Sequence, residues 1–274
     1  MLMDSIDYNN IIKQHPWITE KNKTAILSPD SDGLLCGLFM SHFLNWKIGG
    51  YYDGKILLIK DTLRIEDCVF LDMEIYRPSI RSIGHHMVLF NKNRFPETWD
   101  NFKNCIQPNN IRGYDAYHNF RLKYPLATIH LLLPIVSQMK KIDMIKSAIC
   151  PLLYTDGTFK NLLNFPENCI SWLNFLGGDK KDNPLYEIFY NDHYSVSDLM
   201  LALNNFFGKL SKIGKGADKI KVSNSKGEFV NIIKNGTTYD IIADQRNKTE
   251  SFLEILSKLT GWNYKTEEWA WTGF

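Results

Sequence analysis

Residues 24–46 read TAILSPDSDGLLCGLFMSHFLNW, and this stretch decides the class of fold. It opens with a short apolar run at 24–28, passes through a polar turn at 29–33, and then carries apolar side chains at helical spacing from Leu34 to Trp46. A strand, a turn and a buried helix therefore follow one another without a gap. That order begins a strand–helix–strand unit, which is how parallel sheets are built.

Further apolar runs continue the pattern along the chain. The segments 55–60 and 68–71 are predicted as strands, and 84–90 as part of a fourth. Helices are predicted around 124–138 and 142–147. We therefore expect an α/β fold with an open, mostly parallel sheet and flanking helices.

The segment 177–184 is rich in glycine, charge and proline, which is typical of a linker. We therefore expect two domains, an α/β domain at 1–178 and a smaller α+β domain at 184–274 that is a candidate substrate clamp. The smaller domain is expected to contain two helices and a hairpin, at 196–213, 252–259 and 229–242.

Composition narrows the class of protein. The chain is 44% hydrophobic and 23% charged, as in globular proteins, and its net charge of +2 neither requires nor excludes a nucleic-acid partner. Five scattered cysteines without a CxxC pair fit neither a disulfide framework nor a zinc finger. The N-terminus lacks the basic and apolar regions of a signal peptide, and the most apolar stretch, 127–136, is too short for a membrane span. We expect a cytoplasmic protein that does not enter a membrane.

Acidic residues and histidines stand where four apolar segments end. They are Asp30 and Asp32 in SPDSDG, Asp72 in FLDMEI, His85 and His86 in SIGHHM, and Asp156 in YTDGTF. The carboxyl ends of parallel strands line the ligand crevice of an open sheet, so these side chains are expected to converge. Oxygen and imidazole ligands suit manganese or a similar divalent ion, and a pair of such ions activates water against phosphorus.

Each motif also has a simpler interpretation. Asp-Ser-Asp-Gly is commonly a turn or a helix N-cap, and a carboxylate such as Asp72 after a strand is often a turn residue. If His85 and His86 lie on a strand, they point to opposite faces and at most one of them faces a given metal. The order and setting of the four motifs together favour a metal site.

This order of motifs resembles the DHH superfamily of phosphoesterases, which includes RecJ exonucleases, small-RNA nucleases, cyclic-dinucleotide phosphodiesterases and family II pyrophosphatases. The resemblance covers about residues 24–160. It implies that Asp72 bridges two metal ions, Mn²⁺ or Mg²⁺, and that His86 faces the substrate phosphate, so both are candidate catalytic residues. The remaining implied metal ligands are Asp32, His85 and Asp156 at one ion and Asp30 at the other.

Three positions depart from the family pattern. Ser28 and Ile26 stand where relatives carry a further ligand of the first metal, and Gly84 stands where they carry an aspartate that orients the histidine. We therefore expect one tight metal site and one weaker site. The departures leave two functions open: a rearranged, active phosphoesterase, or a catalytically weakened protein that binds nucleotide or nucleic acid within a larger complex.

Several features outside the motifs bear on partners. The densest basic cluster includes Lys209, Lys212 and Lys215, which either bind a nucleic-acid backbone or form a solvated helix end. The tryptophan-rich C-terminus either stacks on bases or anchors the chain end to the core. His118 and His130 are candidates for a role near the site, and His130 is expected to be a buried, hydrogen-bonded histidine. The leading hypothesis is a phosphodiesterase acting on single-stranded or short nucleic acid, and assembly into a homo-oligomer or larger complex is left open.

Overall fold

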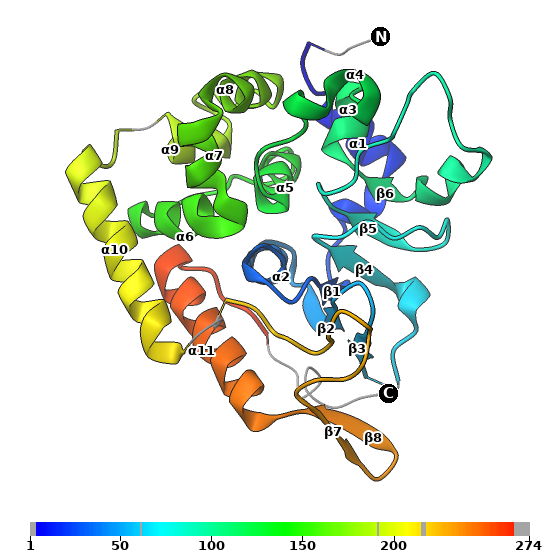
Figure 1. The fold of residues 1–274 in the computed structure, drawn as a ribbon. Helices are drawn as coiled ribbons and strands as arrows, with labels where there is room; N and C mark the ends of the chain where they lie inside the picture. The colour runs from blue at the N-terminus through cyan, green and yellow to red at the C-terminus, as the bar shows by residue number, and fades with distance from the viewer. Residues whose placement is uncertain (1–3, 61, 191, 215–217, 266–274) are drawn as a thin grey trace. The chain divides into compact units, whose positions relative to one another are not determined.

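The computed structural model describes residues 4–60, 62–190, 192–214 and 218–265. It is a mixed α/β structure with a six-stranded, mostly parallel sheet of order β3-β2-β1-β4-β5-β6, flanked by helices, and a small antiparallel sheet β7-β8 (Figure 1). The predicted fold class is confirmed at this level. The strands are β1 (Thr24–Leu27), β2 (Lys47–Tyr52), β3 (Leu57–Ile59), β4 (Cys68–Leu71), β5 (Arg81–Ile83), β6 (Cys105–Ile106), β7 (Ile232–Asn235) and β8 (Thr238–Ile241).

The chain divides into two compact units. The first consists of Met1–Glu20 and Asp72–His193, and the second of Lys21–Leu71 and Tyr194–Phe274. The predicted linker, 177–184, joins two helices of the first unit. The predicted domains at 1–178 and 184–274 stay a prediction.

The second unit begins with the stretch that decides the fold. β1 pairs in parallel with β2 and β4, and β2 pairs antiparallel with β3. The helix α2 (Ser31–Leu44) follows β1 directly, because the Asp30 side chain caps it by accepting a hydrogen bond from the Gly33 N–H at 3.2 Å. A Cβ on Gly33 would lie 2.1 Å from the Ser28 carbonyl oxygen, so this tight turn requires glycine.

The rest of the second unit is largely as predicted. α10 (Val196–Ile213) has the predicted bounds, the hairpin β7-β8 turns at the expected Asn-Gly, and α11 (Ala243–Thr260) is longer than expected. Trp262 is buried against Phe39 and Phe43 of α2, which confirms for this residue that the C-terminal tryptophans anchor the chain. Trp269 and Trp271 lie outside the described residues.

The first unit carries β5, β6 and most of the helices. Its helices are α1 (Tyr8–Gln14), α3 (Pro108–Arg112), α4 (Ala116–Asn119), α5 (Thr128–Ser137), α6 (Ile149–Tyr154), α7 (Thr158–Asn164), α8 (Pro166–Phe175) and α9 (Pro184–Phe189). α5 is buried along nearly its whole length and begins where the His130 Nδ1 accepts a hydrogen bond from the Ala127 N–H at 3.1 Å. His130 is therefore the buried, hydrogen-bonded histidine that the sequence predicts.

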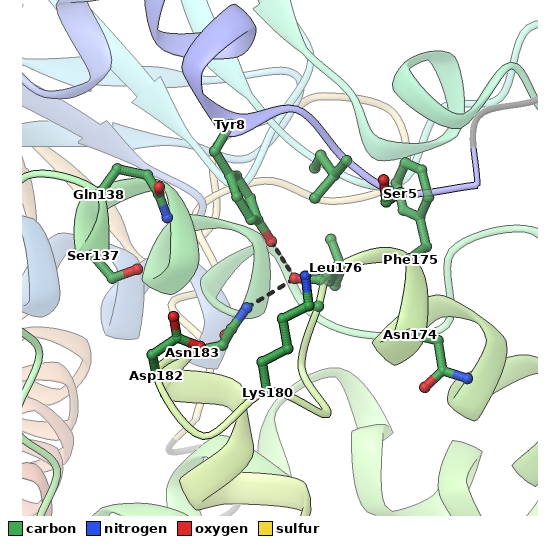
Figure 2. Close-up of a pocket in the computed structure, with 12 residues that line it drawn as sticks. Ser5, Tyr8, Ser137, Gln138, Asn174, Phe175, Leu176, Lys180, Asp182 and Asn183 are labelled. Atoms are coloured by element: carbon green, nitrogen blue, oxygen red, sulfur yellow. Dashed lines mark hydrogen bonds between the residues drawn. The ribbon is translucent and has the colours of Figure 1, made fainter.

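The N-terminal segment is held against the loop between α8 and α9. The Tyr8 hydroxyl and the Asn183 side-chain amide both donate to the Leu176 carbonyl oxygen, at 2.7 and 2.8 Å, beside a small polar pocket of about 240 Å³ (Figure 2). These hydrogen bonds satisfy a carbonyl group that the end of α8 leaves open. The polar groups beside this pocket therefore serve to hold the N-terminal segment against the end of α8.

Three local predictions were wrong. The strand expected over 84–90 ends at Ile83, and residues 84–90 are irregular, since the buried residues Ser82 and Ile83 already complete the pairing with β6. No α-helix forms over 142–147, where four of six positions are polar, charged or exposed, and only a short 3-10 helix begins at Lys146. The apolar run before Asp156, expected to end as a strand, is the helix α6, because so short an apolar run carries no distinguishing period.

A membrane span is not found in the part of the chain that the structure describes: none of those helices is both long and apolar enough to cross a bilayer.

Candidate metal centre

Three separate segments of the first unit bring acidic and imidazole groups together. Asp72 is the first residue after β4, His85 and His86 follow β5 after Gly84, and Asp156 lies between α6 and α7. One ligand atom from each of these four side chains lies within 4.8 Å of all the others. The group can hold a metal ion. The sequence predicts Asp72, His85 and Asp156 as metal ligands, whereas it predicts that His86 faces the substrate phosphate.

Both aspartates have a backbone conformation that few residues adopt. The φ angle is 62° at Asp72 and 50° at Asp156, in the left-handed region where aspartate is tolerated better than most side chains. At each position the chain turns sharply after a buried segment, which directs the carboxylate away from that segment's own hydrogen bonds. Such conformations cluster at functional sites because the surrounding structure must hold them in place.

The distances in the group are short enough for shared ligation. His85 Nε2 lies 3.4 Å from Asp156 Oδ2, and His86 Nδ1 lies 4.0 Å from Asp72 Oδ1. Two ligand atoms that each lie about 2.1 Å from the same ion can be at most about 4.2 Å apart. The widest separation between ligand atoms of the group, within 4.8 Å, would therefore shorten by roughly half an ångström when an ion binds. Asp72 is fully buried and the His86 side chain is 50% exposed, so the group spans from the core to the surface.

The two histidines face the same side, which corrects the sequence-based interpretation. We expected them to point to opposite faces of a strand, but β5 ends before Gly84 and neither histidine is in a strand. Their rings lie 4.1 Å apart at an angle of 31°. Both imidazoles therefore reach the Asp72 carboxylate, His85 through its Nδ1 at 3.5 Å.

Thr128, at the start of α5, sets the orientation of His85. Its hydroxyl donates to Asp72 Oδ1 at 2.7 Å, and its oxygen lies 2.8 Å from His85 Nδ1. Because the single hydroxyl proton is used on the carboxylate, the imidazole must be the donor in the second hydrogen bond. His85 then carries its proton on Nδ1 and directs the lone pair of Nε2 toward Asp156, as a metal ligand requires.

The Glu74 carboxylate lies against Gly84. A Cβ on Gly84 would lie 2.8 Å from both the Glu74 carboxyl carbon and the Met73 backbone carbonyl carbon, so a larger residue at position 84 would require this segment to shift. The Glu74 carboxylate accepts a hydrogen bond from the Met87 N–H at 2.9 Å and lies 3.9 Å from His86 Nδ1. Glu74 therefore places a carboxylate beside His86, two residues after Asp72 in the sequence.

Asp30 and Asp32 belong to the second unit, where the structure gives each a local role. Asp30 is the N-cap of α2, the simpler interpretation that the sequence left open, and its neighbour Asp32 is fully buried in the first turn. The carboxylate of Asp32 accepts a weak hydrogen bond from the Cys36 thiol at 3.7 Å. Their roles as metal ligands stay predictions.

Other predicted site residues have structural explanations or remain untested. His118 is paired with the buried Asp115 at 2.8 Å, and hydrogen bonds with this histidine and the Lys92 N–H hold the pKa of Asp115 at about 2 despite its burial. Lys209 and Lys212 are exposed on α10, and Lys215 lies outside the described residues. Exposure of Lys209 and Lys212 is expected both for a binding surface and for a solvated helix end, so their role in substrate binding stays a prediction.

A cavity of about 710 Å³ adjoins the metal-binding group within the first unit. His85, His86 and Asp156 form one part of its lining, and residues 120–126 and 161–168 contribute the rest. Arg121 and Lys123 are among these residues, so the cavity joins a candidate cation site to two basic side chains. This combination is suited to a phosphate ester, whose negative charge both would attract.

The sequence did not single out Thr128 and Glu74. Thr128 lies 43 residues from His85 and carries no motif. The available signal for Glu74 was the empty position at Gly84, together with an acidic residue inside the second motif.

Comparisons with family models, curated proteins and solved structures find no match.

Proposed function

We propose that this protein is a divalent-metal-dependent phosphoesterase that hydrolyses phosphodiester bonds in single-stranded or short nucleic acid. The observation that carries the proposal is the convergence of Asp72, His85, His86 and Asp156, of which all but the buried Asp72 line a cavity that also has basic residues. The two carboxylates and the imidazole of His85 form a donor set suited to Mn²⁺, with Mg²⁺ as the alternative. A divalent ion bound there would polarise a phosphoryl oxygen and lower the pKa of water.

The protein's own groups have distinct tasks in this proposal. Asp72, Asp156 and the Nε2 of His85 hold the cation, and Thr128 fixes the proton of His85 on Nδ1. His86 is half exposed at the cavity, where an N–H can donate to a phosphoryl oxygen. Arg121 and Lys123 attract the negatively charged ester, so binding is expected to weaken as salt concentration rises.

Metal stoichiometry is part of the proposal. Three of the ligands predicted for the tight site, Asp72, His85 and Asp156, lie in the group, so the group is expected to form the tight site. The weaker site stays the prediction made from the sequence. Calorimetric titration with Mn²⁺ is expected to show one strong binding event and one weak event.

Asp72→Asn tests the function directly. Asparagine tolerates the left-handed backbone at this position, so the variant is expected to fold, while the neutral amide is a poor metal ligand. We expect loss of the strong Mn²⁺ site and of phosphodiester hydrolysis. Asp143→Asn, at an exposed carboxylate of the same unit, serves as the control. A folded Asp72→Asn protein with unchanged turnover would refute the proposal.

The second candidate function is a catalytically weakened binding protein. It is favoured by Ile26, which is fully buried in β1 and stands at a position where members of the superfamily that the motifs resemble carry a metal ligand. Nucleotide binding without turnover at saturating Mn²⁺ would support this candidate over the first.

A further inference from the structure

The cavity beside the metal-binding group is much larger than a phosphate group needs. Its volume of about 710 Å³ falls in the range of pockets that enclose whole organic ligands. The lining residues that do not belong to the metal-binding group come from the chain before α5 and from the α7–α8 region. A part of the substrate other than the phosphate is therefore expected to occupy this space.

Two phenylalanine rings of the lining are unusually exposed. Phe120 is 58% exposed and Phe165 is 59% exposed, although burying such a ring would stabilise the fold by about 2 kcal/mol. The Lys123 ammonium lies 5.0 Å from the centre of the Phe120 ring. Exposed rings beside basic groups are the combination with which proteins bind nucleobases together with their phosphates.

Tyr124 joins the cavity lining to the metal-binding group. It is buried, its hydroxyl donates to the Ala127 carbonyl oxygen at 3.2 Å, and its ring lies 5.8 Å from that of His85. Its ring also packs perpendicular to that of Trp172, at 5.0 Å. Packed aromatic rings therefore support the part of the cavity that adjoins His85.

Two asparagines of the lining present hydrogen-bond acceptors. The Asn161 side-chain amide donates to the Pro125 carbonyl oxygen at 2.7 Å, and that of Asn168 donates to the Lys123 carbonyl oxygen at 3.0 Å. Each carbonyl acceptor requires the NH₂ end of the amide, so the other end of each side chain is an oxygen. Such oxygens can accept from the exocyclic amino group of a base.

We infer that this cavity binds one nucleoside of the substrate, with its base against Phe120 and Phe165 and its phosphate at the metal-binding group. The inference rests on the proposed function and specifies its substrate class: a base-bearing phosphate ester and not pyrophosphate. Adenine, cytosine and guanine, which carry an exocyclic amino group, are favoured over uracil and thymine because Asn161 and Asn168 supply acceptors.

The test compares two ligands that differ only in the base. Binding of adenosine 5′-monophosphate and of ribose 5-phosphate is measured by calorimetry at saturating Mn²⁺, for the unmodified protein and for Phe120→Ala and Phe165→Ala. Loss of base stacking, worth roughly 1–3 kcal/mol per base, corresponds to an affinity about 5- to 150-fold weaker. We expect that loss for the nucleotide in both variants, and no change for ribose 5-phosphate.

Three controls separate stacking from loss of apolar area or of fold. Phe165→Leu keeps the apolar side chain without a ring and is expected to bind the nucleotide weakly, whereas Phe165→Trp is expected to restore binding. Phe95→Ala removes a ring of similar exposure, 60%, that does not line the cavity, and is expected to have no effect.

The outcomes distinguish this inference from the proposed function. The nucleoside pocket would be overturned by unchanged nucleotide affinity in both alanine variants, or by an equal loss of affinity for ribose 5-phosphate. If an abasic diester is still hydrolysed in that case, the phosphoesterase proposal stands. Absence of strong Mn²⁺ binding and of any diester hydrolysis would overturn both.

Discussion

Replacing Thr128 by valine tests whether this residue organises the metal-binding group. The substitution keeps the shape of the side chain and removes the hydroxyl that contacts Asp72 Oδ1 at 2.7 Å and His85 Nδ1 at 2.8 Å. A hydrogen bond to a charged group contributes about 1.5–3 kcal/mol to stability, and a neutral one about 0.5–1.5 kcal/mol. Thr128→Val is therefore expected to lower the free energy of unfolding by roughly 2–4 kcal/mol.

The same substitution is expected to weaken metal binding. Without Thr128, the proton of His85 is no longer confined to Nδ1, and groups that orient ligands in this way contribute about 10- to 100-fold to metal affinity. Urea unfolding of the metal-free protein and calorimetric titration with Mn²⁺ measure the two effects separately. Thr128→Ser keeps the hydroxyl and is expected to retain most of both.

Thr158 offers a matched control on the neighbouring helix α7. It is as fully buried as Thr128, but its hydroxyl has no hydrogen-bond partner among the described residues. Thr158→Val removes a buried polar group without breaking a bond, so stability is expected to stay unchanged or rise. If Thr128→Val binds Mn²⁺ as tightly as the unmodified protein, Thr128 has no part in organising the site.

Three further predictions concern groups around the same site. Gly84→Ala places a Cβ 2.8 Å from the Glu74 carboxyl carbon and is expected to lower the free energy of unfolding by about 1–3 kcal/mol. An unchanged midpoint and slope of the urea unfolding curve would contradict the packing described. Glu74→Gln keeps an acceptor for the Met87 N–H but removes the charge near His86. Mn²⁺ affinity, measured by calorimetry, is therefore expected to fall by about 10-fold, while the free energy of unfolding, measured in urea, is expected to change little. Burial lowers the pKa of His130 from 6.5 to about 3, so the folded state binds fewer protons than the unfolded state between these values. Its contribution to stability is complete above pH 6.5 and decreases by up to about 1.4 kcal/mol per pH unit below it. His130→Asn, which keeps an acceptor for the Ala127 N–H, should lose this part of the pH dependence, and identical pH profiles in the two proteins would show that His130 does not titrate as described.

Local sequence was sufficient for the elements whose signals lie within a few residues. β1, β4, α10 and the hairpin β7-β8 were predicted closely, because an apolar run bounded by turns, a helical period and an Asn-Gly turn are properties of short segments. β2 was not predicted, since its two glycines have low strand propensity. A Cβ on Gly50 would lie 2.0 Å from the Leu58 carbonyl oxygen, and this close approach of the two strands is a property of the pairing, not of the segment.

The candidate site likewise has features that local sequence predicts and features that only the tertiary structure decides. The sequence singled out Asp72, His85 and Asp156 as metal ligands and His86 as the residue that faces the phosphate, because carboxylates and imidazoles after apolar segments are visible as motifs. Only the tertiary structure decided how the histidines are placed: β5 ends before Gly84, so both turn to one side with their rings 4.1 Å apart, contrary to the alternation that a strand would impose.

The supporting groups were decided by tertiary structure alone. Thr128 reaches Asp72 across 56 residues of sequence, and Glu74 fills the space beside Gly84 only because the segments after β4 and β5 lie against each other. Hydrogen bonds of this kind depend on distances between atoms of different segments, and no local pattern encodes those distances. The chain's motifs therefore determine which groups can bind a metal, while the packing of separate segments determines their protonation, their orientation and the aromatic cavity next to them.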